Sequence, residues 1–195
     1  MLLWSMILIG NLSHSQSLPE NNTLISKELD LKNLSYFIAP TFGLTNLDGS
    51  SASIFQVRGG VGSRALSFGG YFQTNINEVI PQSETEPNIY LEYWSAGGFI
   101  EYTLFSDKVF HMTFPLYIGY GEVDMDNEAG NINLGEANFF QVEPSALLEV
   151  NLTDFARLNI GGGYRFVGNM SYRNFNQSDI SGLTGYVGLK VGLFR

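Results

Sequence analysis

Seven charged residues occupy alternate positions in segments that are otherwise apolar or weakly polar. They are Arg58, Glu101, Glu143, Glu149, Arg157, Arg165 and Lys190. Three are acidic and four are basic, so the charges of the set nearly cancel. Because a charge removed from water is costly unless it has a partner, these residues predict a buried network of paired Arg and Glu side chains. Such a network serves either as a structural polar core or as a pathway for protons or ions.

A second group of residues with chemical potential lies in the acidic segment DMDNEAGNINLGE. Its carboxylates are Asp124, Asp126, Glu128 and Glu136. The order resembles an EF-hand calcium loop, but the glycine and the final glutamate are each displaced by one residue and no helix is expected beside the segment. The two interpretations are a calcium site and a solvated acidic hairpin tip. Thermal unfolding with and without calcium distinguishes them.

No constellation of catalytic residues accompanies these groups. His111 is the only histidine after the N-terminal segment, and Thr113 is the hydroxyl residue expected on the same strand face. The glycine runs at 59–62 and 160–163 lie in or beside expected strands without a following helix, so they do not form phosphate-binding loops. We therefore expect no enzymatic activity and no cofactor other than calcium at the acidic segment.

The elements that position these residues are expected to be strands. Eight segments rich in Phe, Tyr, Val, Ile and Leu are each long enough to cross a membrane as a tilted strand. They run over Ser35 to Thr45, Ala52 to Val61, Ala65 to Asn75, Ile89 to Phe105, Val109 to Val123, Asn138 to Leu152, Ala156 to Phe166, and Gly182 to Phe194. No apolar run in the mature chain reaches the length of a transmembrane helix.

The connections between these segments alternate in length. Residues 62–64, 106–108 and 153–155 form short links, whereas residues 76–88, 124–137 and 167–181 form long ones. Transmembrane up-and-down barrels have short periplasmic turns and long external loops. The sequence therefore predicts an all-β fold, an eight-stranded antiparallel up-and-down transmembrane β-barrel. Pro40, Pro115 and Pro144 fall inside its strands and predict local bulges.

Period-two alternation separates two faces in each segment. In the seventh, Leu158, Ile160 and Phe166 share one face, and Arg157 and Arg165 lie on the other. A soluble lipocalin-like barrel that binds an apolar ligand would turn the apolar face inward, and a membrane barrel would turn it outward. The sparse charge of the polar faces and the aromatics near the ends of the apolar faces favour the membrane barrel.

The net charge of −9 over 195 residues belongs to the expected outer loops and their flanks. These hold ten acidic residues and one basic residue, Arg173. The acids are Asp48, Glu78, Glu84, Glu86, Glu122, Asp124, Asp126, Glu128, Glu136 and Asp179. An acidic rim repels lipopolysaccharide unless divalent cations bridge the two. A net negative chain is also a poor nucleic-acid binder.

The N-terminal segment is expected to direct export. MLLWSMILIG is an apolar run too short to cross a bilayer, and polar residues with small Ser13 and Ser15 follow it. We assign residues 1–15 to a signal peptide, residues 16–34 to a periplasmic leader, and residues 35–195 to the barrel. The absence of cysteine is compatible with this destination.

The strand rhythm and the C-terminal GYVGLKVGLFR resemble the small outer-membrane β-barrel proteins of Gram-negative bacteria, the OmpX and OmpA type. In such proteins the last strand alternates apolar outward residues and ends in an aromatic that the barrel-assembly machinery reads. Here Val187, Leu189, Val191 and Leu193 match the alternation, whereas Phe194 is out of phase and Arg195 follows it. The resemblance implies a monomer in the outer membrane, in contact with lipid and lipopolysaccharide. It implies an envelope-structural or surface-interaction role.

Overall fold

The computed structural model describes residues 34–84, 89–127, 136–168, 170–172 and 175–194, with backbone only at 126, 127, 171, 172 and 175. The expected signal peptide and all of the leader except residue 34 lie outside the described residues. The strands are β1 (Ser35–Leu47), β2 (Ser50–Gly62), β3 (Leu66–Asn75), β4 (Ile89–Leu104), β5 (Phe110–Asn127), β6 (Glu136–Asn151), β7 (Ala156–Gly168), β8 (Ser171–Tyr172), β9 (Phe175–Asn176) and β10 (Gly182–Leu193). The helix α1 spans Gln177–Ile180.

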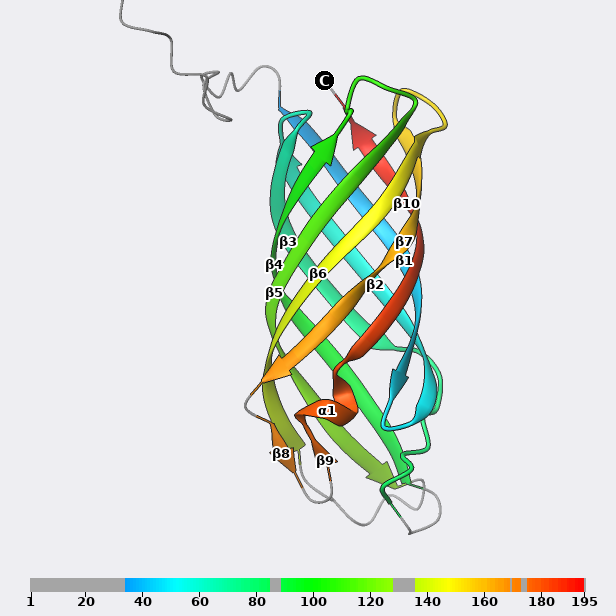
Figure 1. Cartoon of the computed structure of the whole chain (residues 1–195), viewed down its shortest axis with the longest axis vertical. Coiled ribbons are helices and arrows are strands. Elements are labelled where there is room, and N and C mark those ends of the chain that lie inside the picture. The colour runs from blue at the N-terminus through cyan, green and yellow to red at the C-terminus, as the bar shows by residue number, and fades with distance from the viewer. Residues whose placement is uncertain (1–33, 85–88, 128–135, 169, 173–174, 195) are drawn as a thin grey trace, which may run out of the picture.

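Eight of these strands close into one barrel in the order β1-β10-β7-β6-β5-β4-β3-β2, and every neighbouring pair is antiparallel (Figure 1). The predicted up-and-down topology is confirmed. The inner end is named here as the end where β1 begins and β10 ends. The outer end is the opposite one, which carries α1 and the separate β8–β9 hairpin.

The strands differ from the expected segments mainly at the outer end. β5 and β6 pair beyond the expected limits, to Asp124 opposite Glu136. The segment 167–181, expected to be a loop, contains the β8–β9 hairpin and α1. A capping box starts α1, because Asn176 Oδ1 accepts from Ser178 N and Asp179 Oδ2 accepts from Asn176 N, both at 2.8 Å. Among the described residues, no helix is long and apolar enough to cross a bilayer.

The bulges expected at the prolines are absent, and that prediction is wrong. Pro40 pairs with Val57 of β2, and the register between β1 and β10 is the same on both sides of it. Pro115 and Pro144 behave alike, each keeping its partner on one neighbouring strand and interrupting the ladder on the other. Proline removes a donor on one side only, so the ladder omits a bond without inserting a residue.

The two faces of the strands point as in a membrane barrel. Apolar side chains such as Phe42, Ile160 and Val187 are exposed on the outside, with Ile160 55% exposed. Arg58, Glu143 and the other inward charges lie in the interior. This arrangement is the inverse of a soluble lipocalin-like barrel, in which polar side chains face water and apolar ones line the lumen.

Close strand approach inside the barrel leaves no room for a side chain at Gly69. A Cβ at Gly69 would lie 2.0 Å from the Gly59 carbonyl oxygen, whereas one at Gly70 would find no atom closer than 3.6 Å. We expect Gly69→Ala to lower the free energy of unfolding by about 1–3 kcal/mol, because the strands must move apart. Gly70→Ala is the matched control and should have almost no effect. Urea unfolding in detergent micelles measures both, and equal losses would contradict the prediction.

Candidate functional site

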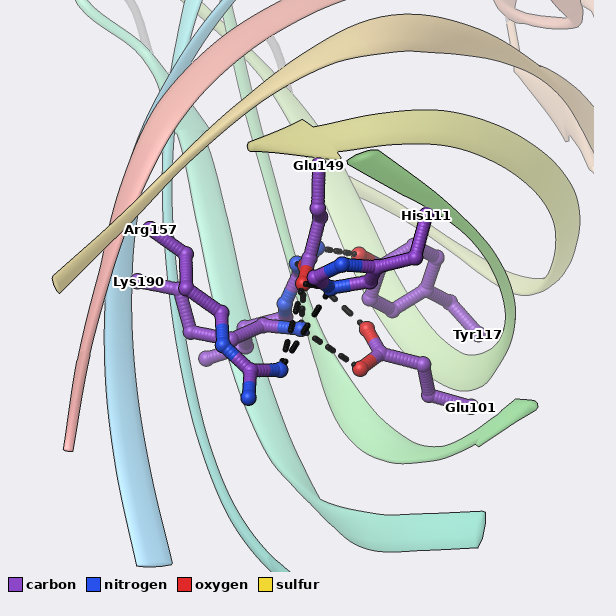
Figure 2. A network of polar contacts seen from close by, with 7 residues as sticks. Glu101, His111, Tyr117, Glu149, Arg157 and Lys190 are labelled. Carbon is purple, nitrogen blue, oxygen red and sulfur yellow. Dashed lines mark hydrogen bonds and ion pairs between the residues drawn. The ribbon is translucent and has the colours of Figure 1, made fainter. Parts of the chain in front are cut away.

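Glu149 on β6 is the centre of an inner charge network near the inner end (Figure 2). The network comprises Arg58, Glu101, His111, Glu149, Arg157 and Lys190. Glu149 Oε2 lies 3.0 Å from His111 Nε2 and 3.8 Å from Arg157 Nη1. Its Oε1 contacts Lys190 Nζ and lies 3.8 Å from Arg58 Nη2. Four nitrogen-bearing side chains from four strands therefore share one buried carboxylate.

Glu101 on β4 is the second carboxylate of the inner charge network. Lys190 Nζ donates to Glu101 Oε1 at 2.7 Å, and Arg58 Nη2 lies 3.4 Å from Glu101 Oε2. Lys190 and Arg58 thus each bridge Glu101 and Glu149, and the side chains of all four are at most 2% exposed. Since these charges are removed from water, mutual pairing is what makes their burial tolerable.

Two members of this region were not among the seven residues predicted to form the lumen charge network. His111 lies directly opposite Glu149 in the β5–β6 ladder. The Tyr117 hydroxyl accepts a hydrogen bond from Arg58 Nη1 at 2.5 Å. Both residues lie on the inward face of β5, and the alternation in the sequence does show that face. Their partners depend on strand register, which the sequence does not show.

A central polar network fills the next layer of the lumen. It comprises Gln56, Gln73, Tyr93, Gln141, Glu143 and Tyr186. Glu143 accepts hydrogen bonds from the Tyr186 hydroxyl and, at 3.1 Å, from Gln141 Nε2. The Tyr93 hydroxyl donates to Gln141 Oε1 and accepts from Gln73 Nε2, each at 2.6 Å. Glu143 therefore accepts these hydrogen bonds from neutral groups rather than from an arginine.

Arg165 on β7 links α1 to the barrel wall by hydrogen bonds. Its Nε donates to the Ile180 carbonyl oxygen at 2.8 Å, and its Nη2 donates to Thr45 Oγ1 at 3.2 Å. The Cζ atom lies 4.9 Å from the centre of the Tyr93 ring, in cation–π geometry. Of the seven predicted lumen residues, Arg165 and Glu143 thus lie outside the inner charge network, which the other five join.

The outer end of the lumen is closed by an apolar cluster. Its buried residues are Leu47, Ala52, Ile54, Val79, Ile89, Leu91, Tyr93, Val123, Met125, Ala137, Phe139, Val167, Met170 and Ile180. Most project inward from strands, but Val79 comes from the segment after β3 and Ile180 from α1. The strand pattern predicted a polar core of paired charges and did not reveal this apolar closure at the outer end. Connecting segments supply part of this apolar closure, because apolar side chains at the rim of the lumen are stable only when other residues cover them.

Asp48, expected on the exposed acidic rim, is buried instead and locks this outer closure. Its Oδ2 accepts from Ser83 N at 2.7 Å, and its N–H donates to the Asp179 carbonyl oxygen at 2.7 Å. We expect Asp48→Gly to speed protease cleavage within residues 76–84 by about tenfold or more, because a charged hydrogen bond is lost. Glycine adopts the positive φ of this position without strain.

Glu78→Gly, which removes an exposed acid from the same segment, is the control for that experiment. Cleavage of both variants is followed by gel electrophoresis of the purified protein. Equal cleavage rates for the Asp48 variant and the original chain would show that the hydrogen bond to Ser83 does not hold the closure.

The acidic segment is only partly within the described residues. Asp124 lies opposite Glu136 in the β5–β6 ladder and opposite Glu92 of β4, and its Oδ1 accepts from Met125 N at 2.7 Å. Glu128 and the side chain of Asp126 lie outside the described residues. Within the described part of the chain, no group of three or more His, Asp or Glu residues could hold a metal ion. The calcium site stays a prediction.

Comparisons with known proteins give structural neighbours. No protein-family model matches the chain, and no curated protein matches its sequence. Neisserial surface protein A (NspA) matches in structure with a TM-score of 0.60 and 13% identity, over 82% of this chain and 96% of that one. Ail, the attachment invasion locus protein of Yersinia pestis, in complex with the heparin analogue sucrose octasulfate, matches with a TM-score of 0.51 and 13% identity, over 82% and 97%. The chain has the fold of the small outer-membrane β-barrels.

Phe194, the aromatic residue that follows the last barrel strand β10, does not continue the outward alternation of that strand. Val187, Leu189 and Leu193 are exposed on the outer surface, as the alternation requires. Phe194 packs instead against the inward cluster that contains Phe37, and the Arg157 guanidinium lies 3.6 Å from the centre of its ring. The phase difference noted in the sequence therefore turns Phe194 toward the inner mouth of the barrel.

Proposed function

We propose that the chain is a non-enzymatic integral protein of the outer membrane, a monomeric barrel closed to solutes. The observation that carries the proposal is the filled lumen, with the inner charge network toward the inner end and the apolar closure at the outer end. Among the described residues, the single histidine is His111, whose Nε2 hydrogen-bonds with Glu149 Oε2 at 3.0 Å and lies 3.4 Å from Arg157 Nη1 rather than beside a serine or threonine hydroxyl. This arrangement supports a structural rather than a catalytic use of the lumen.

The outer end supports an envelope-structural or surface-interaction role. Glu78, Glu122 and Glu136 lie there with exposed or half-exposed side chains. Divalent cations would link such carboxylates to the phosphates of lipopolysaccharide. NspA is named a surface protein and Ail an attachment protein, which fits a role at the cell surface. Ail was solved with a sulfated ligand, whereas acidic side chains at this rim favour cationic or cation-bridged partners.

Three measurements test this proposal. Membrane fractionation of cells that express the chain should recover it with the outer membrane, and it should migrate differently on gels before and after heating. Reconstitution in planar bilayers should give no steady current. Recovery in the soluble periplasm would favour a lipocalin-like barrel that binds an apolar ligand, and a steady current would contradict the closed lumen.

A further inference from the structure

A hollow opens at the inner end of the barrel and is lined by an excess of basic groups. Its polar lining includes Ser35, Ser63, Arg64, Ser67, Arg157 and Lys190, together with Glu101. Three cations and one carboxylate thus surround it. The outer end is acidic, so the two mouths of the barrel have opposite electrostatic character. A mouth with an excess of one sign of charge attracts ions of the other sign.

The charges behind the hollow do not neutralise this excess. Glu101 is already paired with Lys190 and Arg58, and Glu149 is shared by the same two side chains. Arg157 reaches Glu149 only at 3.8 Å. Arg64 forms no ion pair with any residue that the structure describes. Of the three cations that line the hollow, Arg64 and Arg157 are therefore the two without a close carboxylate of their own.

Both guanidinium groups line the hollow, where an anion could reach both. Arg157 stacks on the Phe194 ring at 3.6 Å, which fixes its plane and leaves in-plane N–H donors for hydrogen bonding. Arg64 is exposed in the turn between β2 and β3. Lys190 Nζ lies beside them from β10, and its position is fixed by Glu101 at 2.7 Å. Two planar forks and one ammonium, with serine hydroxyls between them, suit an anion with several oxygens.

We propose that this inner-mouth hollow binds a phosphate group, with Arg64 and Arg157 as its main ligands and Lys190 and the serine hydroxyls as secondary donors. The phosphate belongs either to a soluble phosphate compound or to a phospholipid headgroup at the membrane surface. Both sources present the same tetrahedral oxyanion. The site is independent of the closed-lumen function proposed above, because it requires only the mouth of the barrel.

Isothermal titration of the full, folded protein in dodecyl maltoside tests this site. One arm uses inorganic phosphate at constant ionic strength, and the other uses dihexanoyl phosphatidic acid below its micelle concentration. We expect saturable binding in at least one arm, and about tenfold weaker binding by Arg64→Gln, since one charge-assisted contact is lost. Binding of the lipid alone identifies a headgroup, and binding of inorganic phosphate identifies a site for soluble phosphates.

Lys108→Gln is the matched control, because it removes one positive charge from an exposed side chain in the short link between β4 and β5, and Lys108 does not line the hollow. Its affinity should equal that of the original chain. Arg157→Lys keeps the charge and removes the fork, so it should also bind more weakly. No saturable binding in either arm, or equal affinity of the Arg64 and Lys108 variants, would overturn the proposal.

Discussion

Replacing Glu149 with glutamine should lower the free energy of unfolding by about 3–5 kcal/mol, the largest effect expected from any single substitution in this chain. The carboxylate is the shared partner of Lys190, Arg58, His111 and Arg157. A neutral amide of the same shape leaves Lys190 and Arg58 to share the single carboxylate of Glu101, and it removes the carboxylate partner of His111 and Arg157. The loss is therefore electrostatic and not a loss of packing. Urea unfolding of the protein in detergent micelles measures it.

The control for this experiment is Glu92→Gln, the same chemical change at an exposed position of β4. It should alter the free energy of unfolding by no more than about 0.5 kcal/mol, as surface substitutions usually do. A double variant that also removes Lys190 as Lys190→Met should recover part of the loss, because one uncompensated cation is then gone. If the two glutamine variants unfold at the same urea concentration, Glu149 does not organise the inner charge network.

Placing an arginine on the outer surface should be nearly as costly. Ile160 is exposed on β7 opposite Val187 of β10, away from both ends of the strand. In a phospholipid bilayer, Ile160→Arg should lower the free energy of unfolding by about 2–4 kcal/mol, because its guanidinium would lie in the hydrocarbon region. Reversible unfolding in vesicles, rather than in detergent, gives the relevant value.

The cost of a charge on the lipid-facing surface depends on its depth in the bilayer, and this dependence supplies the control for the arginine experiment. Leu193 is exposed at the last residue of β10, and Leu193→Arg should cost only about 0–1 kcal/mol, because its side chain reaches the membrane interface. Equal stability of the Ile160 variant and the original chain would contradict a membrane-embedded outer surface. It would favour a soluble barrel, because replacing an exposed isoleucine with arginine makes the surface of such a protein more soluble in water.

Several features of the fold could be predicted because they depend on neighbours along the chain. Alternation at period two placed Ile160 outside and Arg165 inside, since side-chain direction in a strand is a local property. A second local inference was wrong: the missing N–H donor of Pro40 suggested a bulge, but the ladder between the strands lost only a hydrogen bond. The lengths of the links predicted the topology, yet they did not reveal that residues 167–181 contain a short helix whose Ile180 is buried.

Which side chains meet was decided by the closure of the barrel. By itself, the sequence determined that the inward residues include both signs of charge and that the outer loops are acidic. Only the tertiary structure placed His111 and Lys190 on the same carboxylate of Glu149, and put Val79 into the outer closure. The physical reason is register: Lys190 of β10 meets Glu149 of β6 only because pairing around the whole barrel brings these strands together. Even between the consecutive strands β5 and β6, the alignment that places His111 opposite Glu149 follows from no local pattern.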